Sequence, residues 1–247
     1  MTILLLLLGA GIIAGVQNAL AGGGSFVTLG MLVIAGLDPR SANITSTIAL
    51  FPGQVATGYA GRRFATGTPR LSFAALFGIS LVGGVLGACL LLATPPTFFA
   101  SLVPWLVLFA TGVFAWGSFL RRPAPGAMPS GPGAAGVAQF LIAIYGGYFG
   151  GGIGFLMLAA LTVAGLPVRP ASATKNVLAA TMNASAVVIF LFSRDVHWPE
   201  AAALASGAIV GGLLGTVLLT RVNERALRVG VIVLGAALSV GLFARGH

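Results

Sequence analysis

Long apolar runs recur along the entire chain, and short stretches of glycine, proline and arginine separate them. Hydrophobic residues make up 57% of the 247 positions and charged residues only 7%, a more apolar composition than that of soluble domains. Because the runs continue to the end of the chain, a single cleaved signal peptide at the start cannot account for them. The sequence therefore predicts an all-α polytopic membrane protein.

The apolar runs form two series of five. Before the middle of the chain, helices are expected at about 3–20, 25–36, 42–61, 70–93 and 98–120. After a linker rich in proline and glycine at 121–134, they are expected at about 135–149, 152–165, 171–193, 199–220 and 224–244. The second element of each series has only about 12 to 14 residues, whereas a membrane crossing needs about 20. These elements are expected to be half-helices or parts of re-entrant hairpins, giving about eight to ten membrane segments.

The two halves of the chain resemble each other at a spacing of 129 residues. The identical pairs are Phe26 and Phe155, Gly36 and Gly165, Leu37 and Leu166, Arg40 and Arg169, Ala42 and Ala171, and Thr45 and Thr174. Six identities in the same order predict an internal duplication. We expect a first membrane repeat at 1–120, a cytoplasmic linker at 121–134 and a second membrane repeat at 135–247.

The charge of the connections predicts how the two repeats are oriented. Arginines cluster at 62–70, 121–122 and 221–228, so these connections are expected on the cytoplasmic side. The connections at 94–97 and 194–200 are uncharged or nearly neutral and are expected outside. This alternation requires the first two elements of each half to return the chain to its starting side, which makes the repeats inverted and both termini external. If those two elements merged into one long helix, the repeats would instead be parallel.

Several function classes find no support in the sequence. The net charge of +9 fits cytoplasmic arginine clusters in a membrane protein and does not call for a nucleic-acid partner. Cys89 is the one cysteine, which excludes an intramolecular disulfide and a cysteine metal cluster. Patterns typical of metal sites, nucleophile–base pairs and phosphate-binding loops are absent, so we expect no cofactor, no bound metal and no enzyme. A membrane enzyme or a structural membrane protein is the alternative.

Glycine clusters precede both half-helices. The segments AGGGS (21–25) and GGYFGGGIG (146–154) allow the backbone to turn sharply and leave amide groups free for an anion. The alternative is that these glycines only allow close helix packing. Gly23, Gly24, Ser25, Gly151 and Gly152 are the candidate binding residues in these segments.

The third element of each half carries a polar face. Asn43, Thr47 and Gln54 are spaced by four and seven residues and therefore share one side of a helix. The spacing of 129 maps them onto three further polar residues, Ser172, Asn176 and Asn183. Unpaired polar groups are costly in hydrocarbon, so the presence of this polar face in both halves predicts a shared polar cavity. Hydrogen bonds between helices are the alternative.

Lys175 is the only lysine, and it lies in the first turns of a predicted helix, where the helix dipole disfavours a cation. A bound anion would compensate this charge, with Thr45, Ser46, Thr174 and Asn176 supplying hydrogen bonds. The alternative is a lysine that extends to the lipid headgroups. The complete predicted substrate site is Gly23, Gly24, Ser25, Asn43, Thr45, Ser46, Thr47, Gln54, Gly151, Gly152, Thr174, Lys175, Asn176 and Asn183.

The acidic residues bear on energy coupling. Asp38, Asp195, Glu200 and Glu224 all lie at predicted loops or helix ends, so no intramembrane carboxylate is expected to relay protons. Coupling to protons would therefore use a loop carboxylate, Lys175 or protonation of the substrate. Export driven only by the substrate gradient is equally compatible with the sequence.

The stretches AGGGSFVTLGMLVIAGLDPRSANITST and GGYFGGGIGFLMLAALTVAGLPVRPASATKN resemble the paired signatures of the TauE/SafE sulfite exporter family, also called the toluenesulfonate uptake permeases. The likeness covers nearly the whole chain and includes the glycines, the AGL turn and the A-x-x-T helix start of both halves. It implies a transporter of sulfite, organosulfonates or related small anions in the inner membrane of a bacterial cell. Transport of another small organic anion is the alternative, and the oligomeric state is left open.

Overall fold

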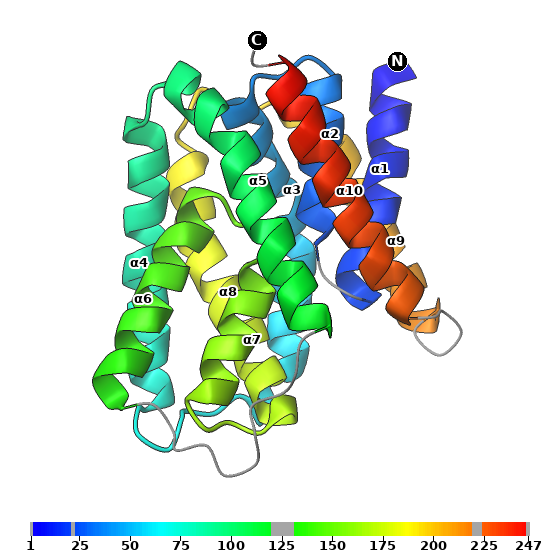
Figure 1. Ribbon diagram of the computed structural model, residues 1–247. Helices are drawn as coiled ribbons and strands as arrows, with labels where there is room; N and C mark the ends of the chain where they lie inside the picture. Colours follow the sequence, from blue (N-terminus) through cyan, green and yellow to red (C-terminus); the bar gives the residue numbers. More distant parts are fainter. Residues whose placement is uncertain (1, 21–22, 120–130, 219–223, 246–247) are drawn as a thin grey trace.

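The computed structural model describes residues 2–20, 23–119, 131–218 and 224–245. They form ten α-helices and one short 3-10 helix (Figure 1). The elements are α1 (Thr2–Leu20), α2 (Gly24–Ile34), α3 (Pro39–Gly61), η1 (Arg62–Phe64), α4 (Phe73–Ala93), α5 (Pro96–Phe119), α6 (Pro132–Tyr148), α7 (Ile153–Val163), α8 (Val168–Phe190), α9 (Trp198–Leu218) and α10 (Glu224–Arg245). The predicted all-α class is confirmed, and each predicted helix is present.

The outer surface of the helices is apolar. On α4, the exposed residues include Phe77, Leu81, Val82, Leu86 and Leu90, whereas the glycines Gly83, Gly84 and Gly87 of the same helix are buried. Both α4 and α5 are long and apolar enough to cross a membrane. A helix with apolar residues outside and small residues inside is the arrangement expected in lipid.

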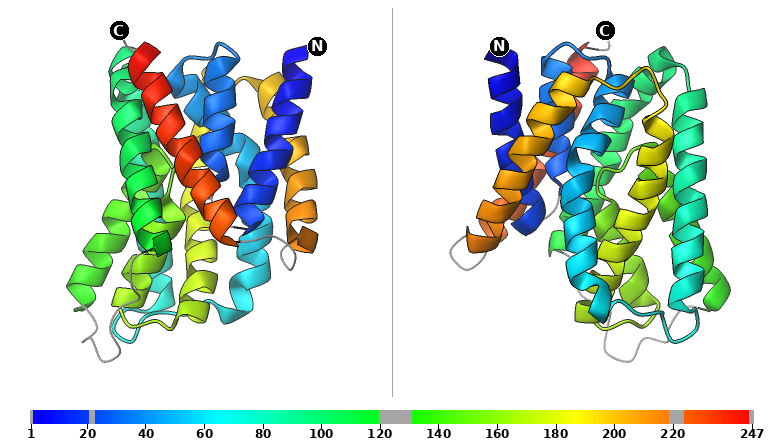
Figure 2. Two further views of the ribbon diagram at one scale, coloured as in Figure 1. Left: turned by 45° about the vertical axis from the view of Figure 1, so that its right-hand side comes forward. Right: turned by 180° about the vertical axis from the view of Figure 1, so that it is seen from behind.

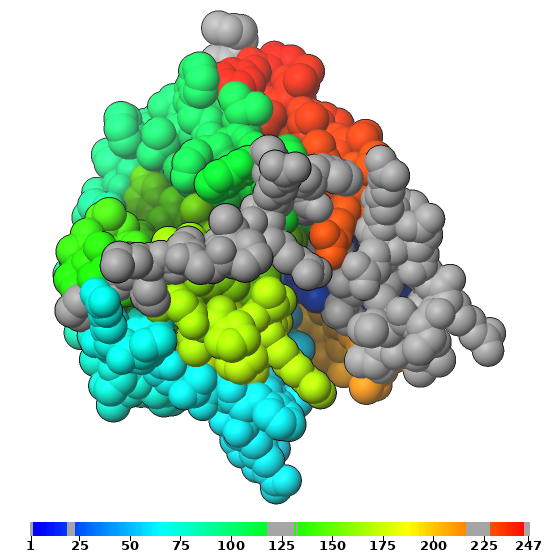
Figure 3. All heavy atoms as spheres, turned by 60° about the horizontal axis from the view of Figure 1, so that its bottom comes forward, coloured from blue at the N-terminus to red at the C-terminus, as the bar shows by residue number. Residues whose placement is uncertain are grey.

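Connections between the helices lie on two opposite faces of the molecule. Helix α1 begins and helix α10 ends on one face, which also carries the connections at 35–38 and 191–197 (Figures 1 and 2). We call this the terminal face. The connections at 65–72 and 164–167 lie on the other face, which we call the opposite face. Figure 3 views the opposite face and shows the 65–72 connection beside the start of α8.

The short helices α2 and α7 each fold back beside the helix before them. In Figures 1 and 2, α1 descends from the terminal face and α2 returns toward it, whereas α6 rises from the opposite face and α7 returns there. Each short helix has 11 residues, or about 16 Å of length, which is about half of a hydrocarbon core. The structure therefore favours re-entrant hairpins over crossings for these elements.

The second and third helices of each half begin and end at positions 129 residues apart. The helices α2 and α7 have 11 residues each, and α3 and α8 have 23 residues each. Glycines in the left-handed region start both short helices, Gly23 with φ 83° and Gly152 with φ 73°. Gly36 and Gly165, with φ of 101° and 98°, form the turns that follow. These matches are what a duplicated unit requires, and descent of the two halves from one unit stays a prediction.

Glycine lets two pairs of helices approach closely. A Cβ atom on Gly211 of α9 would overlap the backbone of Ile12 in α1, and one on Gly87 of α4 would overlap the backbone of Ile144 in α6. Both glycines belong to the segments GGVLG (83–87) and GGLLG (211–215), which recur in the two halves. Close backbone contact through small residues is a common way to hold membrane helices together.

The contact between α1 and α9 predicts a contrast between two adjacent glycines. We expect Gly211→Ala to lower the free energy of unfolding by about 1–3 kcal/mol, because the added methyl group meets the rigid backbone of Ile12. Gly212→Ala is the matched control, since a Cβ there has no neighbour within 4 Å. The thermal midpoints of the two variants in detergent would test this. Equal midpoints would contradict the proposed packing role.

Candidate functional site

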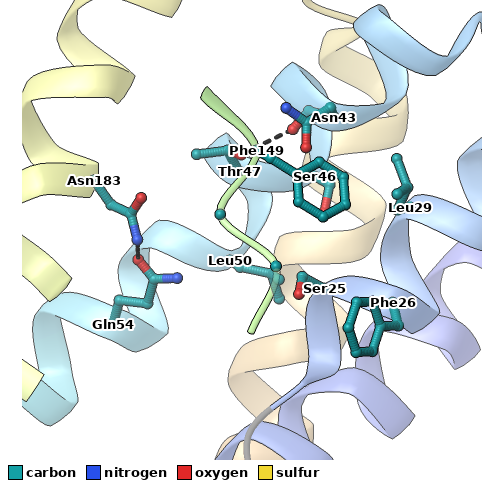
Figure 4. Close-up of a pocket in the computed structure, with 12 residues that line it drawn as sticks. Ser25, Phe26, Leu29, Asn43, Ser46, Thr47, Leu50, Gln54, Phe149 and Asn183 are labelled. Carbon is teal, nitrogen blue, oxygen red and sulfur yellow. Dashed lines mark hydrogen bonds between the residues drawn. The ribbon is translucent and has the colours of Figure 1, made fainter. Parts of the chain in front are cut away.

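A polar pocket lies where two broken helices meet α3 and α8 (Figure 4). The start of α2 forms one side of it, α3 forms another, and the turn between α6 and α7 closes it together with α8. The lining residues are Ser25, Phe26, Leu29, Asn43, Ser46, Thr47, Leu50, Gln54, Phe149, Gly150, Gly151 and Asn183. The pocket therefore draws on both halves of the chain.

Half of the predicted site residues line this pocket. They are Ser25, Asn43, Ser46, Thr47, Gln54, Gly151 and Asn183. Phe149 and Gly150 line it as well, and the sequence reasoning missed both, although they belong to the glycine-rich segment that it singled out. None of the described lining residues carries a formal charge. The pocket is therefore neutral, and its lining combines polar side chains with apolar ones, namely Phe26, Leu29, Leu50 and Phe149.

Hydrogen bonds fix the pocket side chains on α3. The hydroxyl groups of Ser46 and Thr28 lie 2.6 Å apart, which ties α3 to α2. The amide Nδ2 of Asn43 donates to the carbonyl oxygen of Tyr148 at 3.1 Å, which ties α3 to the end of α6. Thr47 donates to the carbonyl oxygen of Asn43 at 2.8 Å within α3. These bonds hold the pocket wall against both hairpins.

Gln54 and Asn183 meet across the interface between the halves. Asn183 Nδ2 donates to Gln54 Oε1 at 2.6 Å (Figure 4). Asn183 is only 2% exposed, and its Oδ1 atom has no hydrogen-bond partner among the described residues. A buried acceptor without a partner is costly. This atom is available to a hydrogen-bond donor that enters the pocket.

The glycines at the start of α2 turn the chain and form backbone hydrogen bonds, and they do not line the pocket. The Gly24 amide donates to Asn18 Oδ1 at 2.8 Å, so this amide is already bonded, contrary to the expectation that it is free for an anion. Gln17 Nε2 donates to the Gly23 carbonyl oxygen at 3.4 Å. The adjacent polar residues Gln17 and Asn18, which interrupt an apolar run, were the sequence signal for this cap. Gly152 has the corresponding place as the N-cap of α7.

Thr45 and Thr174 bind connections between helices. Thr45 Oγ1 accepts from the His197 amide at 3.2 Å on the terminal face. Thr174 Oγ1 accepts from the Thr66 amide at 2.9 Å and donates to the Thr66 carbonyl oxygen at 3.0 Å on the opposite face. Each threonine thus holds a connection from the other half of the chain. Neither hydroxyl faces the pocket, which differs from the predicted role as substrate ligands.

Lys175 lies apart from the pocket. Its Nζ atom is 3.8 Å from the position that a Cβ atom on Gly154 would take, at the start of α7. Among the described residues, Lys175 has no hydrogen-bond or ion-pair partner. Asn176, the next residue of α8, is partly buried and does not line the pocket either.

An ion pair links three elements on the terminal face. Arg40 Nη2 donates to both carboxylate oxygens of Asp195, at 3.1 and 2.9 Å, and Arg40 Nη1 donates to the Thr94 carbonyl oxygen at 2.9 Å. Ser193 Oγ also donates to Asp195, at 2.8 Å. These bonds join α3, the end of α4 and the connection before α9. Bidentate arginine–carboxylate pairs are the strong form of this contact.

The terminal face carries both acidic and basic residues, such as Asp195 and Arg194, whereas arginines gather on the opposite face. Arg62, Arg63, Arg70 and Arg169 are exposed on the opposite face, and among the described residues none of them has a carboxylate partner. Arg169 instead lies 6.0 Å from the centre of the Phe64 ring. The connections with Arg121 and Arg221 lie outside the described residues. An excess of arginine on one side is typical of a cytoplasmic face.

The fold and the pocket define an all-helical membrane protein in which two half-helices begin beside a polar cavity between the two faces. The family model of the sulfite exporter TauE/SafE proteins matches residues 7–242. The chain belongs to this family and is a multi-pass membrane transporter of the bacterial cell membrane.

Known proteins from three bacteria are similar over nearly their whole length. The chain is 28% identical over 244 residues to "Probable membrane transporter protein YfcA" of Escherichia coli strain K12, covering 95% of this chain and 87% of the relative. It is 29% identical over 246 residues to "Probable membrane transporter protein ORF9" of Sinorhizobium sp, with coverages of 95% and 90%. It is 26% identical over 240 residues to a "Probable membrane transporter protein" of Haemophilus influenzae, with coverages of 94% and 91%. These names state transport and no substrate.

The two bonds of Thr174 predict a structural role. We expect Thr174→Val to lower the free energy of unfolding by about 1–3 kcal/mol, because both backbone groups of Thr66 lose their partner. Thr181→Val is the matched control, since its hydroxyl donates only within α8, to Val177. Thermal unfolding in detergent measures the difference. If Thr174→Val instead weakened substrate binding without changing stability, the threonine would be a ligand after all.

Proposed function

We propose that this transporter carries sulfite, an organosulfonate or a related small sulfur-containing anion by alternating access. The observation that supports the proposal most is the polar pocket between the starts of α2 and α7. Secondary transporters commonly bind substrates between broken helices near the membrane midplane. The substrate class follows the family description, which names sulfite exporters.

The chemistry of the lining suits a small oxyanion. The Ser25 hydroxyl group and the Gln54 side-chain amide can donate hydrogen bonds to sulfonate or sulfite oxygens. The hydroxyl groups of Ser46 and Thr47 already bond Thr28 and the Asn43 carbonyl oxygen, so they would have to exchange those partners for the anion. The N-terminal ends of α2 and α7 point their partial positive charges inward. The described lining residues include no carboxylate, so no formal negative charge would repel an anion there. Protonation of the substrate itself is the coupling route that this lining favours.

Alternating access would use the two inverted repeats, at 1–120 and 135–247, on either side of the linker at 121–134. The Arg40–Asp195 ion pair supports a state in which the terminal face is closed. Arg169, the residue 129 positions after Arg40, has no carboxylate partner among the described residues. If the opposite face is cytoplasmic, as its arginines suggest, the pocket is closed to the outside in this state.

Flux measurements test the transport proposal. Proteoliposomes that contain the protein should take up or release labelled sulfite or methanesulfonate faster than empty vesicles. Asn43→Ala should raise the KM by about two- to tenfold, the effect of one neutral hydrogen bond. Ser101→Ala is the control, because Ser101 is exposed on α5 and bonds only to Phe98. An absence of flux for every anion in a broad panel would contradict the proposed function.

The ion pair on the terminal face predicts a gate. In a Cys89→Ala background, a reporter cysteine at Ser46 should react about fivefold faster with an impermeant thiol reagent from the terminal face when Asp195→Asn is added. This factor corresponds to an ion pair of ~1 kcal/mol that favours the closed state. Glu200→Gln is the control, because it removes a carboxylate from the same face without touching Arg40. Equal labelling rates in both variants would exclude the gate.

A further inference from the structure

Ser46 and Lys175 hold corresponding places in the two halves but lie far apart. They are 129 positions apart in the sequence, and so are Gln54 and Asn183, each eight residues further along α3 or α8. The two helices run antiparallel, since Gly58 lies beside Ala180 and Gly61, further along α3, lies beside Ala173, further back along α8. Eight residues of helix span about 12 Å. The backbone positions of Ser46 and Lys175 therefore lie about 12 Å to either side of the Gln54–Asn183 hydrogen bond along the helices.

The Lys175 side chain extends into the protein. Its Nζ and Cδ atoms lie close to Gly154, which is the second residue of α7. Because α7 runs from the interior to the opposite face, Gly154 is at the interior end of that helix. A lysine that reached for lipid headgroups would extend the other way. The snorkelling alternative for Lys175 is therefore disfavoured.

Space for this ammonium group comes from substitutions between the halves. Ser25, which lines the pocket, corresponds to Gly154, which has no side chain. Thr28, which is hydrogen-bonded to Ser46, corresponds to Met157, which cannot donate a hydrogen bond. The place of Lys175 in the second half thus has more room and fewer bonds than the place of Ser46 in the first half.

We propose that Lys175 forms a second anion-binding station, separate from the pocket and on the side of the opposite face. This inference rests on the proposed function and assigns a second site on the same path. An intramembrane lysine without a partner among the described residues is energetically costly unless an anion visits it. Asn176 stands next to it, as Thr47 stands next to Ser46 in the pocket.

The two stations differ in charge, and this difference suits passage of an anion. The Lys175 station attracts an anion from the side where the exposed arginines lie. The neutral pocket holds the anion less strongly and releases it more readily toward the terminal face. The Gln54–Asn183 pair itself lines the pocket and lies between Ser46 and Lys175 along the helices, so an anion passes this pair when it moves from one station to the other. Several weak sites in series favour rapid passage.

Corresponding reporter cysteines test the proposal. In a Cys89→Ala background, Thr47→Cys reports on the pocket and Asn176→Cys on the Lys175 station. Each is alkylated with N-ethylmaleimide in the presence of increasing methanesulfonate, which does not react with thiols or maleimides. We expect methanesulfonate to protect both cysteines. Adding Lys175→Gln should raise the concentration needed for protection at Asn176→Cys by roughly ten- to a hundredfold and leave Thr47→Cys protected as before.

Reciprocal variants show that a loss is local. Ser46→Ala, the corresponding change in the pocket, should weaken protection at Thr47→Cys by about two- to tenfold and spare Asn176→Cys. Lys175→Arg should retain most of the protection at Asn176→Cys. A parallel loss at both reporters in Lys175→Gln, with Ser46→Ala also affecting both, would show one shared site and overturn the inference. Protection at Thr47→Cys alone would overturn it as well, whereas protection at neither cysteine would argue against the proposed function itself.

Discussion

Two helices that begin inside the membrane fold are the constraint on which the remaining structure depends. A helix start leaves backbone amides without partners, and lipid cannot supply them. The starts of α2 and α7 therefore lie within the protein, where Asn18 bonds the Gly24 amide and left-handed glycines turn the chain. Polar side chains of α3 and α8 surround these starts. The pocket is thus a direct consequence of the two helix starts within the protein, in addition to its proposed role in binding.

The charged Lys175 side chain lies apart from the neutral pocket, and this separation shapes the proposed transport mechanism. A lysine in direct contact with the pocket would hold an anion strongly and slow its release. In this protein the pocket offers neutral donors, and the ammonium group of Lys175 lies near Gly154 on the other side of the Gln54–Asn183 pair. In the proposed path, Lys175 attracts the anion strongly, and the neutral pocket releases it easily.

Contacts between the two halves lie at both ends of the helices that carry the site. Thr45 of α3 holds the connection before α9, and Thr174 of α8 holds the connection before α4. These two threonines are 129 positions apart, and each bonds a connection from the other half, Thr45 through one hydrogen bond and Thr174 through two. The ion pair of Arg40 with Asp195 adds to the contact on the terminal face only. The described contacts between the halves therefore include an ion pair on the terminal face and only hydrogen bonds at Thr174 on the opposite face.

The sequence by itself determined where the helices lie along the chain and which helices of the two halves correspond. Apolar runs, glycines and prolines act locally, so their positions alone predict these features. The predicted segments agree with the observed ones to within about three residues, and the 129-residue spacing anticipated the matching bounds of α2 and α7. It also identified seven of the twelve lining residues, and three of them, Asn43, Thr47 and Gln54, follow from helical spacing, which places them on one face. Only the tertiary structure decided which polar groups meet. The antiparallel packing of α3 and α8 separates Lys175 from Ser46, and it joins Arg40 to a carboxylate 155 residues away. Such pairings depend on distances across the fold, which local patterns do not encode.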